Sequence, residues 1–115
     1  MATLADGERY FGPFCATGAV TGTGAAINIK LDFKPIRVDL WNIDDAGGGT
    51  DLYWSQGMPA ASGRKVIDSG AGTTNLSYIS ADGITVGGNG FTIGADGDVN
   101  VSGESIAWTA FRSFR

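Results

Sequence analysis

The chain has 115 residues, enough for one compact domain, and it combines 19 glycines with a charged fraction of only 17%. Eight Lys and Arg against twelve Asp and Glu give a net charge of −4 and a pI near 4.4. Because nucleic-acid binding needs a clustered basic surface, this balance excludes nucleic acid as a partner. No apolar run approaches the roughly 18 residues of a membrane-spanning helix, so we also expect no membrane partner.

Residues 1–18 differ from the rest of the chain and form a candidate N-terminal arm, followed by a single domain at 19–115. The arm lacks the basic and apolar regions of a signal peptide, so we expect the chain to be made in a cytoplasm. It mixes polar residues with three aromatic ones, Tyr10, Phe11 and Phe14. Two interpretations are open. Either the arm docks its rings into a neighbouring subunit, or it forms the first edge strand of its own sheet.

The single cysteine, Cys15, cannot form an intramolecular disulfide, so the fold does not depend on an oxidising compartment. No basic residue lies close to it in sequence, and the chain has no histidine that would activate its thiol. We interpret Cys15 as a small, half-buried apolar residue.

Short segments of alternating apolar and polar residues follow one another between Gly, Pro, Asp and Asn turn residues. This spacing is typical of β-strands and too short for helices. We expect an all-β fold, an antiparallel β-sandwich of the jelly-roll type with about eight short strands. The expected strand segments are 25–31, 36–43, 51–58, 64–69, 74–80, 81–86, 91–93, 99–101 and 104–114.

The apolar positions of these segments define the expected core, because alternate residues of a strand share one face. Segment 104–114 is apolar on both faces, so we expect it to be a central strand or a subunit contact. The dipeptide Asp82-Gly83 predicts a turn. The residues expected to be buried are Ile27, Ile29, Leu31, Ile36, Val38, Leu40, Phe91, Ile93, Ile106 and Trp108.

Histidine, which many catalytic and metal sites need, is missing from the sequence. The absence of histidine removes the Ser-His-Asp and Cys-His arrangements and the commonest zinc ligand. Segment 96–100 begins like a calcium loop, but Val101 and Ala107 stand where that loop needs its glycine and its glutamate. We therefore expect no catalytic residue, no metal and no cofactor, and we interpret Asp96 and Asp98 as turn residues.

Two pairs of carboxylates, Asp44 with Asp45 and Asp96 with Asp98, have the residue type that a glycosidase uses. Both pairs lie in glycine-flanked segments without the apolar pocket that would raise the pKa of one carboxyl group. We therefore predict that the protein is not an enzyme and that these acidic loops face outward.

Three aromatic residues, Trp41, Tyr53 and Trp54, flank one glycine-rich loop. They can fill the core or a subunit interface, where Trp and Tyr are enriched. They can also stack on the sugar rings of a glycan. A tryptophan exposed beside a carboxylate would favour the glycan interpretation.

Three stretches of the sequence match a known family in their order and spacing. They are GTGAAINIKLDFKPIRVDLWN from residue 22, LYWSQGMP from residue 52 and ISADGITVGGNGFTIGADGDVNVSGESIAWTAFR from residue 79. Together they resemble small bacteriophage virion proteins and phage fibre-tip domains. In that family a GF-x-P-x-x-V-x-L-x-N strand precedes a W-x-x-x-MP segment, and the chain closes with GFTIG-x-D-x-x-N-V-x-G-E-x-x-x-W-x-A. The resemblance covers about residues 20–112 and departs from the family at Asp32, where glycine is usual.

The resemblance implies a small antiparallel β-sandwich without enzymatic activity that decorates a virion. Because the chain has no fibre-shaft repeats, we expect a capsid decoration (cement) protein that binds the outer surface of the head and stabilises it. The implied partners are the major capsid protein and further copies of the chain in a homotrimer. The alternative is a tail-fibre tip or a glycan-binding receptor-recognition module. Either location is reached after synthesis in the host cytoplasm.

Overall fold

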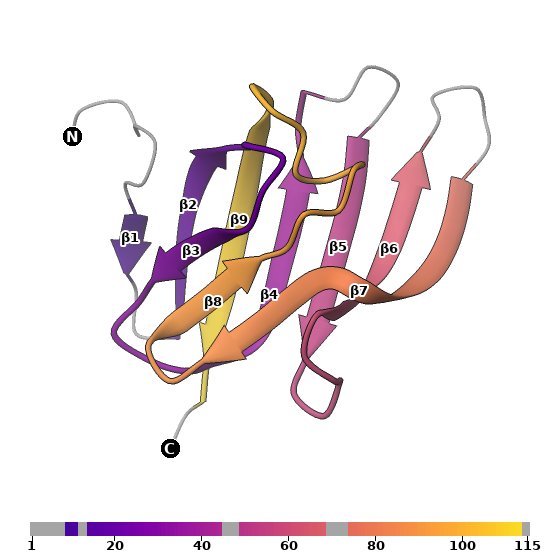
Figure 1. Cartoon of the computed structure of the whole chain (residues 1–115). Helices are drawn as coiled ribbons and strands as arrows, with labels where there is room; N and C mark the ends of the chain where they lie inside the picture. Colours follow the sequence, from indigo (N-terminus) through magenta and orange to yellow (C-terminus); the bar gives the residue numbers. More distant parts are fainter. Residues whose placement is uncertain (1–8, 12–13, 45–48, 69–73, 114–115) are drawn as a thin grey trace.

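The computed structural model describes residues 9–11, 14–44, 49–68 and 74–113 (Figure 1). Within these ranges the protein consists of strands, turns and loops, and it contains no helix long and apolar enough to cross a membrane. Every neighbouring pair of strands is antiparallel. The predicted all-β antiparallel class is therefore confirmed.

The described ranges contain nine strands, and most of them follow the alternating segments of the sequence. Their bounds are β1 (Arg9–Phe11), β2 (Cys15–Thr21), β3 (Ile27–Lys30), β4 (Pro35–Asn42), β5 (Gly49–Ser55), β6 (Ser62–Asp68), β7 (Thr74–Gly87), β8 (Gly90–Ile93) and β9 (Ser105–Arg112).

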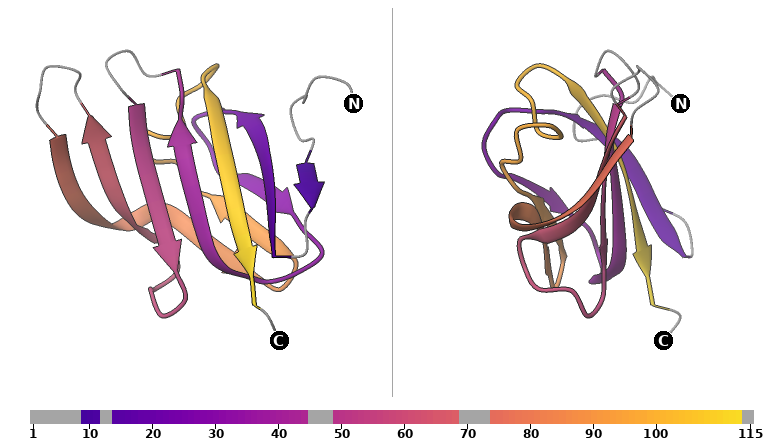
Figure 2. Two further views of the ribbon diagram at one scale, coloured as in Figure 1. Left: turned by 180° about the vertical axis from the view of Figure 1, so that it is seen from behind. Right: turned by 90° about the vertical axis from the view of Figure 1, so that its right-hand side faces the viewer.

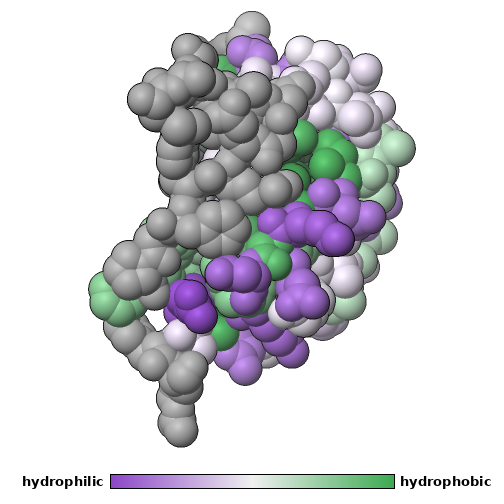
Figure 3. Space-filling model, turned by 90° about the vertical axis from the view of Figure 1, so that its left-hand side faces the viewer, coloured by the Kyte–Doolittle hydropathy of each residue, from purple (hydrophilic) through white to green (hydrophobic). Residues whose placement is uncertain are grey.

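These strands form one sheet in the order β1-β2-β9-β4-β5-β6-β7-β8-β3. The sheet curls over, so that β3, β8 and the second half of β7 lie in front of the layer formed by β2, β9, β4, β5 and β6 (Figures 1 and 2). The expected sandwich is therefore a single sheet folded into two layers. On the side of the molecule that carries β1 and β3, hydrophobic residues are visible between hydrophilic ones at the surface (Figure 3).

Strand β7 belongs to both layers because it bends in mid-strand. Its first half pairs with β6, and its second half pairs with β8. The bend lies at Asp82, whose φ of 62° is left-handed, and at Gly83, where a Cβ would lie 2.3 Å from the carbonyl oxygen of Ser62. The prediction of two strands, 74–80 and 81–86, joined by a turn is therefore wrong, because the dipeptide bends one continuous strand.

Side chains from both layers form one core. Of the ten predicted core residues eight are buried, and Ile27 and Ile36 are half-buried. The layers meet at Phe91 of β8 and Trp108 of β9, whose rings pack edge to face with their centroids 5.5 Å apart. Strand β9 lies between β2 and β4, so of the two predicted alternatives, a central strand or a subunit contact, the structure shows the central strand.

The connection from β8 to β9, residues 94–104, contains no strand and runs across the core. Val99 inserts into the core, and the next residue, Asn100, is also buried. The Asn100 side chain donates two hydrogen bonds and accepts two, all with the backbone of Thr23, Gly24, Ala25 and Gly94. The predicted strand at 99–101 is therefore wrong, because side-chain hydrogen bonds take the place of a strand ladder.

A buried ion pair fixes the start of this connection to the sheet. Lys65 of β6 points into the core, and its Nζ lies 2.8 Å from Asp96 Oδ1 and 2.5 Å from Asp98 Oδ2. Burial lowers the pKa of Lys65, but the hydrogen bonds to the two carboxylates outweigh burial, so that its pKa is raised. The prediction that Asp96 faces outward is wrong because this carboxylate binds the buried ammonium group, whereas Asp98 is exposed.

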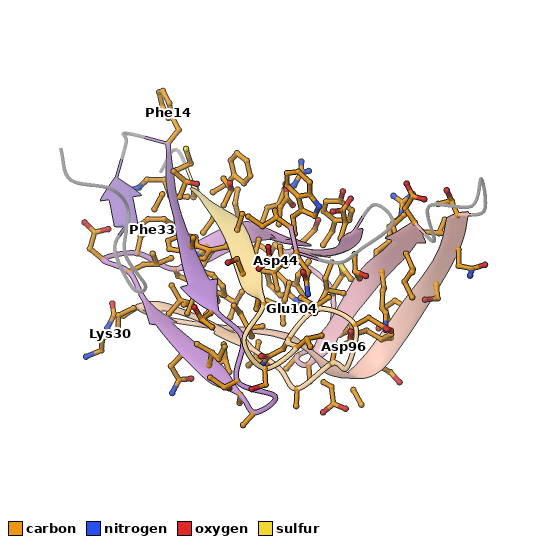
Figure 4. All side chains as sticks on the ribbon, turned by 90° about the horizontal axis from the view of Figure 1, so that it is seen from above. Phe14, Lys30, Phe33, Asp44, Asp96 and Glu104 are labelled. Carbon is orange, nitrogen blue, oxygen red and sulfur yellow. The ribbon has the colours of Figure 1, made fainter. Side chains whose placement is uncertain are left out.

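The other end of the connection is held by the end of β4 (Figure 4). The side-chain amide of buried Asn42 donates to Glu104 Oε1 at 2.8 Å and to the carbonyl oxygen of Val99 at 3.1 Å. Exposed Asp44 accepts a hydrogen bond from the backbone N–H of Ser105 at 2.7 Å. Its neighbour in the sequence, Asp45, lies outside the described residues.

The N-terminal segment belongs to the sheet where it is described. Strand β1 pairs with β2, and β2 pairs with β9, so Arg9–Phe11 forms an edge strand. The boundary predicted at residue 18 falls inside β2, which makes 15–18 part of the domain. For residues 9–11 the structure therefore agrees with the edge-strand interpretation. The contact of the arm with a neighbouring molecule stays a prediction. Cys15 is half-buried.

We expect Trp108→Ala to lower the free energy of unfolding by roughly 3 to 5 kcal/mol, because it removes a ring that joins the two layers and leaves a cavity. Trp41→Ala is the matched control: this ring is exposed on the far side of the sheet, and its loss should cost less than about 1 kcal/mol. Urea unfolding followed by circular dichroism measures both values. Equal losses would contradict the assignment of Trp108 to the core.

We expect Asp96→Asn to cost roughly 1 to 3 kcal/mol of stability, because it removes the buried carboxylate partner of Lys65 and leaves exposed Asp98 as the remaining carboxylate beside the ammonium group. Asp98→Asn, at an exposed partner of the same ammonium, should cost less than about 1 kcal/mol. Urea unfolding again measures both.

The raised pKa of Lys65 also determines how the stabilisation by the Lys65–Asp96 ion pair depends on pH. The stabilisation is complete below the pKa of lysine in the unfolded chain, about 10.4, and is lost as the pH rises through the higher pKa of the folded state. The difference in stability between wild type and Asp96→Asn should therefore shrink above about pH 10.5. A difference that stays constant to the alkaline end would contradict the ion pair.

Candidate functional site

The outer face of the sheet is the surface of β9, β4, β5 and β6 that points away from the core. Because side chains alternate along a strand, the residues between core positions lie on this face. The pairing of β4 with β5 places Trp41 opposite Asp51 and Asp39 opposite Tyr53. The outer face includes Arg37, Asp39, Trp41, Asp51, Tyr53, Arg64, Val66, Ala107 and Thr109.

Trp41 is the most prominent side chain at the centre of the outer face. Half of its surface, 50%, is exposed. Its indole lies against the start of β5, where a Cβ on Gly49 would come within 2.6 Å of Trp41 Nε1. Glycine at this position, with a φ of 100°, therefore leaves room for the ring.

Tyr53 and Asp51 form a hydrogen-bonded pair beside this ring. The Tyr53 hydroxyl donates to Asp51 Oδ2 at 2.9 Å. Burial raises the pKa of Tyr53, and the hydrogen bond to Asp51 together with the negative charges of Asp51 and Asp39 raises it further. The phenol therefore stays protonated and holds the Asp51 carboxylate in place.

Asp39 is held by an arginine on its own strand. Arg37 Nε lies 3.0 Å from Asp39 Oδ1, and a second guanidinium nitrogen lies 3.2 Å from Oδ2. The same guanidinium lies over the ring of Phe111, 5.4 Å from its centroid. This two-point contact fixes the orientation of the Asp39 carboxylate.

These side chains line a shallow groove of about 570 Å³ on the outer face. Its described lining carries three carboxylates and no Lys or Arg. Hydroxyl groups of threonine complete it: Thr17 donates to the carbonyl oxygen of Trp108. The side chains that line the groove include Thr17, Asp39, Trp41, Asp51, Tyr53, Val66, Asp68, Thr74 and Thr109.

A second hollow of about 550 Å³ adjoins the groove on the other side of Tyr53. Asp51, Tyr53 and Val66 line both hollows, but the second one also contains Arg37 and Arg64. The charge of the outer face therefore changes from negative to mixed across one tyrosine ring.

The groove presents an exposed aromatic ring, fixed carboxylate acceptors and hydroxyl groups. This combination suits a ligand with an apolar face and several hydrogen-bond donors. Among the described residues no three His, Cys, Asp or Glu side chains converge as a metal site requires.

The structure separates the three aromatic residues proposed as an interface or glycan-stacking set. Trp41 and Tyr53 lie on the outer face, but Trp54 is only 7% exposed, and its Nε1 donates to the carbonyl oxygen of Pro59 at 3.1 Å. Trp54 therefore fills the core, as one of the two interpretations allowed, and does not belong to an interface or glycan-stacking surface, because it shares the core face of β5 with Leu52. The alternation of β5 is the sequence signal that separates Trp54 from Tyr53.

The aromatic residues of the predicted arm are only partly described. Phe14 is 53% exposed and points away from the body of the molecule (Figure 4). Its carbonyl oxygen accepts a hydrogen bond from the N–H of Arg112, which ties it to the end of β9. The backbones of Tyr10 and Phe11 lie in β1, and their side chains are outside the described part of the structure.

The sequence analysis missed two exposed side chains of β7. Leu76 and Tyr78 are 59% and 57% exposed, and they lie opposite Val66 and Arg64 of β6. This register extends the outer face to the first half of β7. The sequence signal for them is weak, because the alternation of this segment resembles that of a half-buried strand.

No family model, no curated protein and no solved structure matches this chain. The assignment of the site therefore depends on the chemistry of its own residues.

Proposed function

We propose that this chain is a non-enzymatic structural protein of a bacteriophage virion, a decoration (cement) protein that binds the outer surface of the head and stabilises it. The resemblance of residues 20–112 to small virion proteins supports this function. The structural observation that carries it is the exposure of five large apolar side chains on a body with a well-packed core. They are Phe14, Trp41, Ile43, Leu76 and Tyr78. Exposed apolar side chains of this size favour association with other proteins.

Phe14 is the described residue best placed for contact with the major capsid protein. It projects from the body of the molecule (Figure 4), and it lies close in sequence to the predicted arm residues Tyr10 and Phe11. Burying a phenylalanine side chain in a partner's pocket contributes roughly 1.5 to 3 kcal/mol. Docking of this ring on the capsid would therefore strengthen attachment. The homotrimer implied by the resemblance belongs to the same proposal.

The test uses undecorated heads of the phage that encodes the chain, mixed with the full-length protein and separated by sedimentation. We expect saturable binding to the heads. Phe14→Ala should weaken it by about 10- to 100-fold, in line with the free energy of burying that ring.

Gln56→Ala, which truncates an exposed polar side chain in the turn between β5 and β6, is the control and should leave head binding unchanged. Deletion of residues 2–14 should weaken binding at least as much as Phe14→Ala. A full-length protein that does not bind heads would refute the decoration function. Binding to tails instead would support the fibre-tip alternative.

A second candidate function is glycan recognition, and the groove around Trp41 favours it. A sugar ring has an apolar face that stacks on an indole, and neighbouring hydroxyl groups that donate to carboxylates. Trp41 is exposed, and Asp51 lies directly opposite it in the β4–β5 register. An exposed tryptophan beside a carboxylate is expected of a glycan-binding module, whereas aromatic residues that serve only in packing would be buried.

The test of this candidate is titration of the tryptophan fluorescence with glucose, galactose, mannose and N-acetylglucosamine. We expect one of them to change the emission of Trp41. Asp51→Asn should weaken that binding by about tenfold or more, because a charged acceptor is replaced by a neutral one.

Tyr78→Ala removes an exposed aromatic residue outside the groove and should leave the sugar affinity unchanged. No spectral change up to about 10 mM of any of these sugars would refute glycan recognition at this groove.

A further inference from the structure

The first half of β7 has an open edge. Residues Thr74 to Ile79 pair with β6 on one side. Among the described residues no strand pairs with their other side, because β8 joins β7 only from Ile84 onward. This half of β7 forms the right-hand border of the sheet in Figure 1.

The open edge lacks the features that prevent strands from pairing with other chains. The segment 74–80 reads TNLSYIS and contains no charged residue and no proline. Its pairing with β6 runs without a register shift from Thr74 to Ile79. An uncharged, regular edge of this length is a template for a further strand. The other outer strands are protected better: β3 has four residues and ends at exposed Lys30, and β1 has three.

The side chains of this edge are apolar on one face. Leu76 and Tyr78 alternate along the strand, lie on the outer face and are each more than half exposed. They continue the row of Val66, which lies opposite Leu76. A monomer would leave both of them in water, and a strand added at the edge would cover them.

We propose that a second copy of the chain pairs with this edge, antiparallel, about a two-fold axis at Ser77. In this register Leu76 of each copy lies opposite Tyr78 of the other, and Ser77 lies opposite itself. An axis at Leu76 would instead place Leu76 opposite itself and Tyr78 opposite Thr74. An axis at Tyr78 would place Tyr78 opposite itself and Leu76 opposite Ser80. The axis at Ser77 pairs both exposed apolar residues at once, which gives the self-complementary contact of a two-fold dimer.

The charges near the edge permit this contact. Lys65 lies opposite Ser77 but is buried on the core face. The nearest cation on the outer face is therefore Arg64, opposite Tyr78 on β6. With strands about 4.8 Å apart and about 3.4 Å per residue, the two copies of Arg64 would be about 16 Å apart, beyond the screening length of about 8 Å at physiological salt. Backbone hydrogen bonds along the paired edges would supply affinity, and the Leu76–Tyr78 contacts would supply the register.

This pairing goes beyond the decoration function and does not depend on it. It makes the two-fold contact the association of the protein in solution, and the homotrimer of the decoration proposal is then an arrangement that the copies adopt on the head. It also joins the outer faces of two molecules into one continuous surface.

The first test is cross-linking in a Cys15→Ala background, which removes the native thiol. Ser77→Cys places two thiols across the axis at a Cα separation of about 5 Å, within the range of a disulfide. Ser80→Cys is the control on the same strand, where the two thiols would be about 20 Å apart. We expect mild oxidation to link Ser77→Cys into dimers at least about tenfold faster than Ser80→Cys. Equal rates would refute the register.

The second test is sedimentation of the uncross-linked protein over a concentration series. We expect a mass of two chains, and Leu76→Lys should raise the dissociation constant by about tenfold or more. Trp41→Lys, a charge at another exposed apolar site, should leave it unchanged. A monomer up to about 100 µM, a trimer, or equal effects of the two substitutions would each overturn the proposal.

Discussion

The ion pair between Lys65 and Asp96 is the contact on which the arrangement of this fold depends. A curled sheet needs a segment across its concave side, and residues 94–104 provide it without forming a strand. Such a segment has no ladder of its own, so its position must come from side chains. A charge pair in the interior is a strong constraint, because separating it would leave the Asp96 carboxylate buried without a positively charged partner. Asn42 and Asn100 add the backbone contacts that complete the position of the segment.

Local properties of the fold could be predicted from the sequence. The alternation in and next to β3, β4, β8 and β9 placed eight core residues correctly, because the period of a strand is visible in neighbouring residues. The bend of β7 could not be predicted, because the need for Gly83 arises from the carbonyl oxygen of Ser62 on another strand. The burial of Asp96 likewise depends on Lys65, which is distant in sequence. The aspartate and glycine residues around Asp96 predict a turn, but they do not indicate that a distant lysine binds this carboxylate.

The candidate site shows the same limit. The exposure of Trp41 follows from its position between core residues Leu40 and Asn42 on β4. The grouping of that ring with Asp51 and Tyr53 instead follows from the β4–β5 register, which is fixed by the fold and not by either strand alone. The sequence therefore yields Trp41 and Tyr53, the aromatic residues of the groove, but not the carboxylates that give the groove its chemistry.

The bend in β7 also determines how the molecule responds to force. Because the two layers share one uninterrupted backbone, a load applied at the outer edge of the sheet reaches the opposite layer through covalent bonds. In a sandwich of two separate sheets, the same load would pass through side-chain packing and the connecting loops. Here the layers cannot slide past one another without unbending the strand at Asp82 and Gly83. Resistance to shear is thus a property of the backbone path itself.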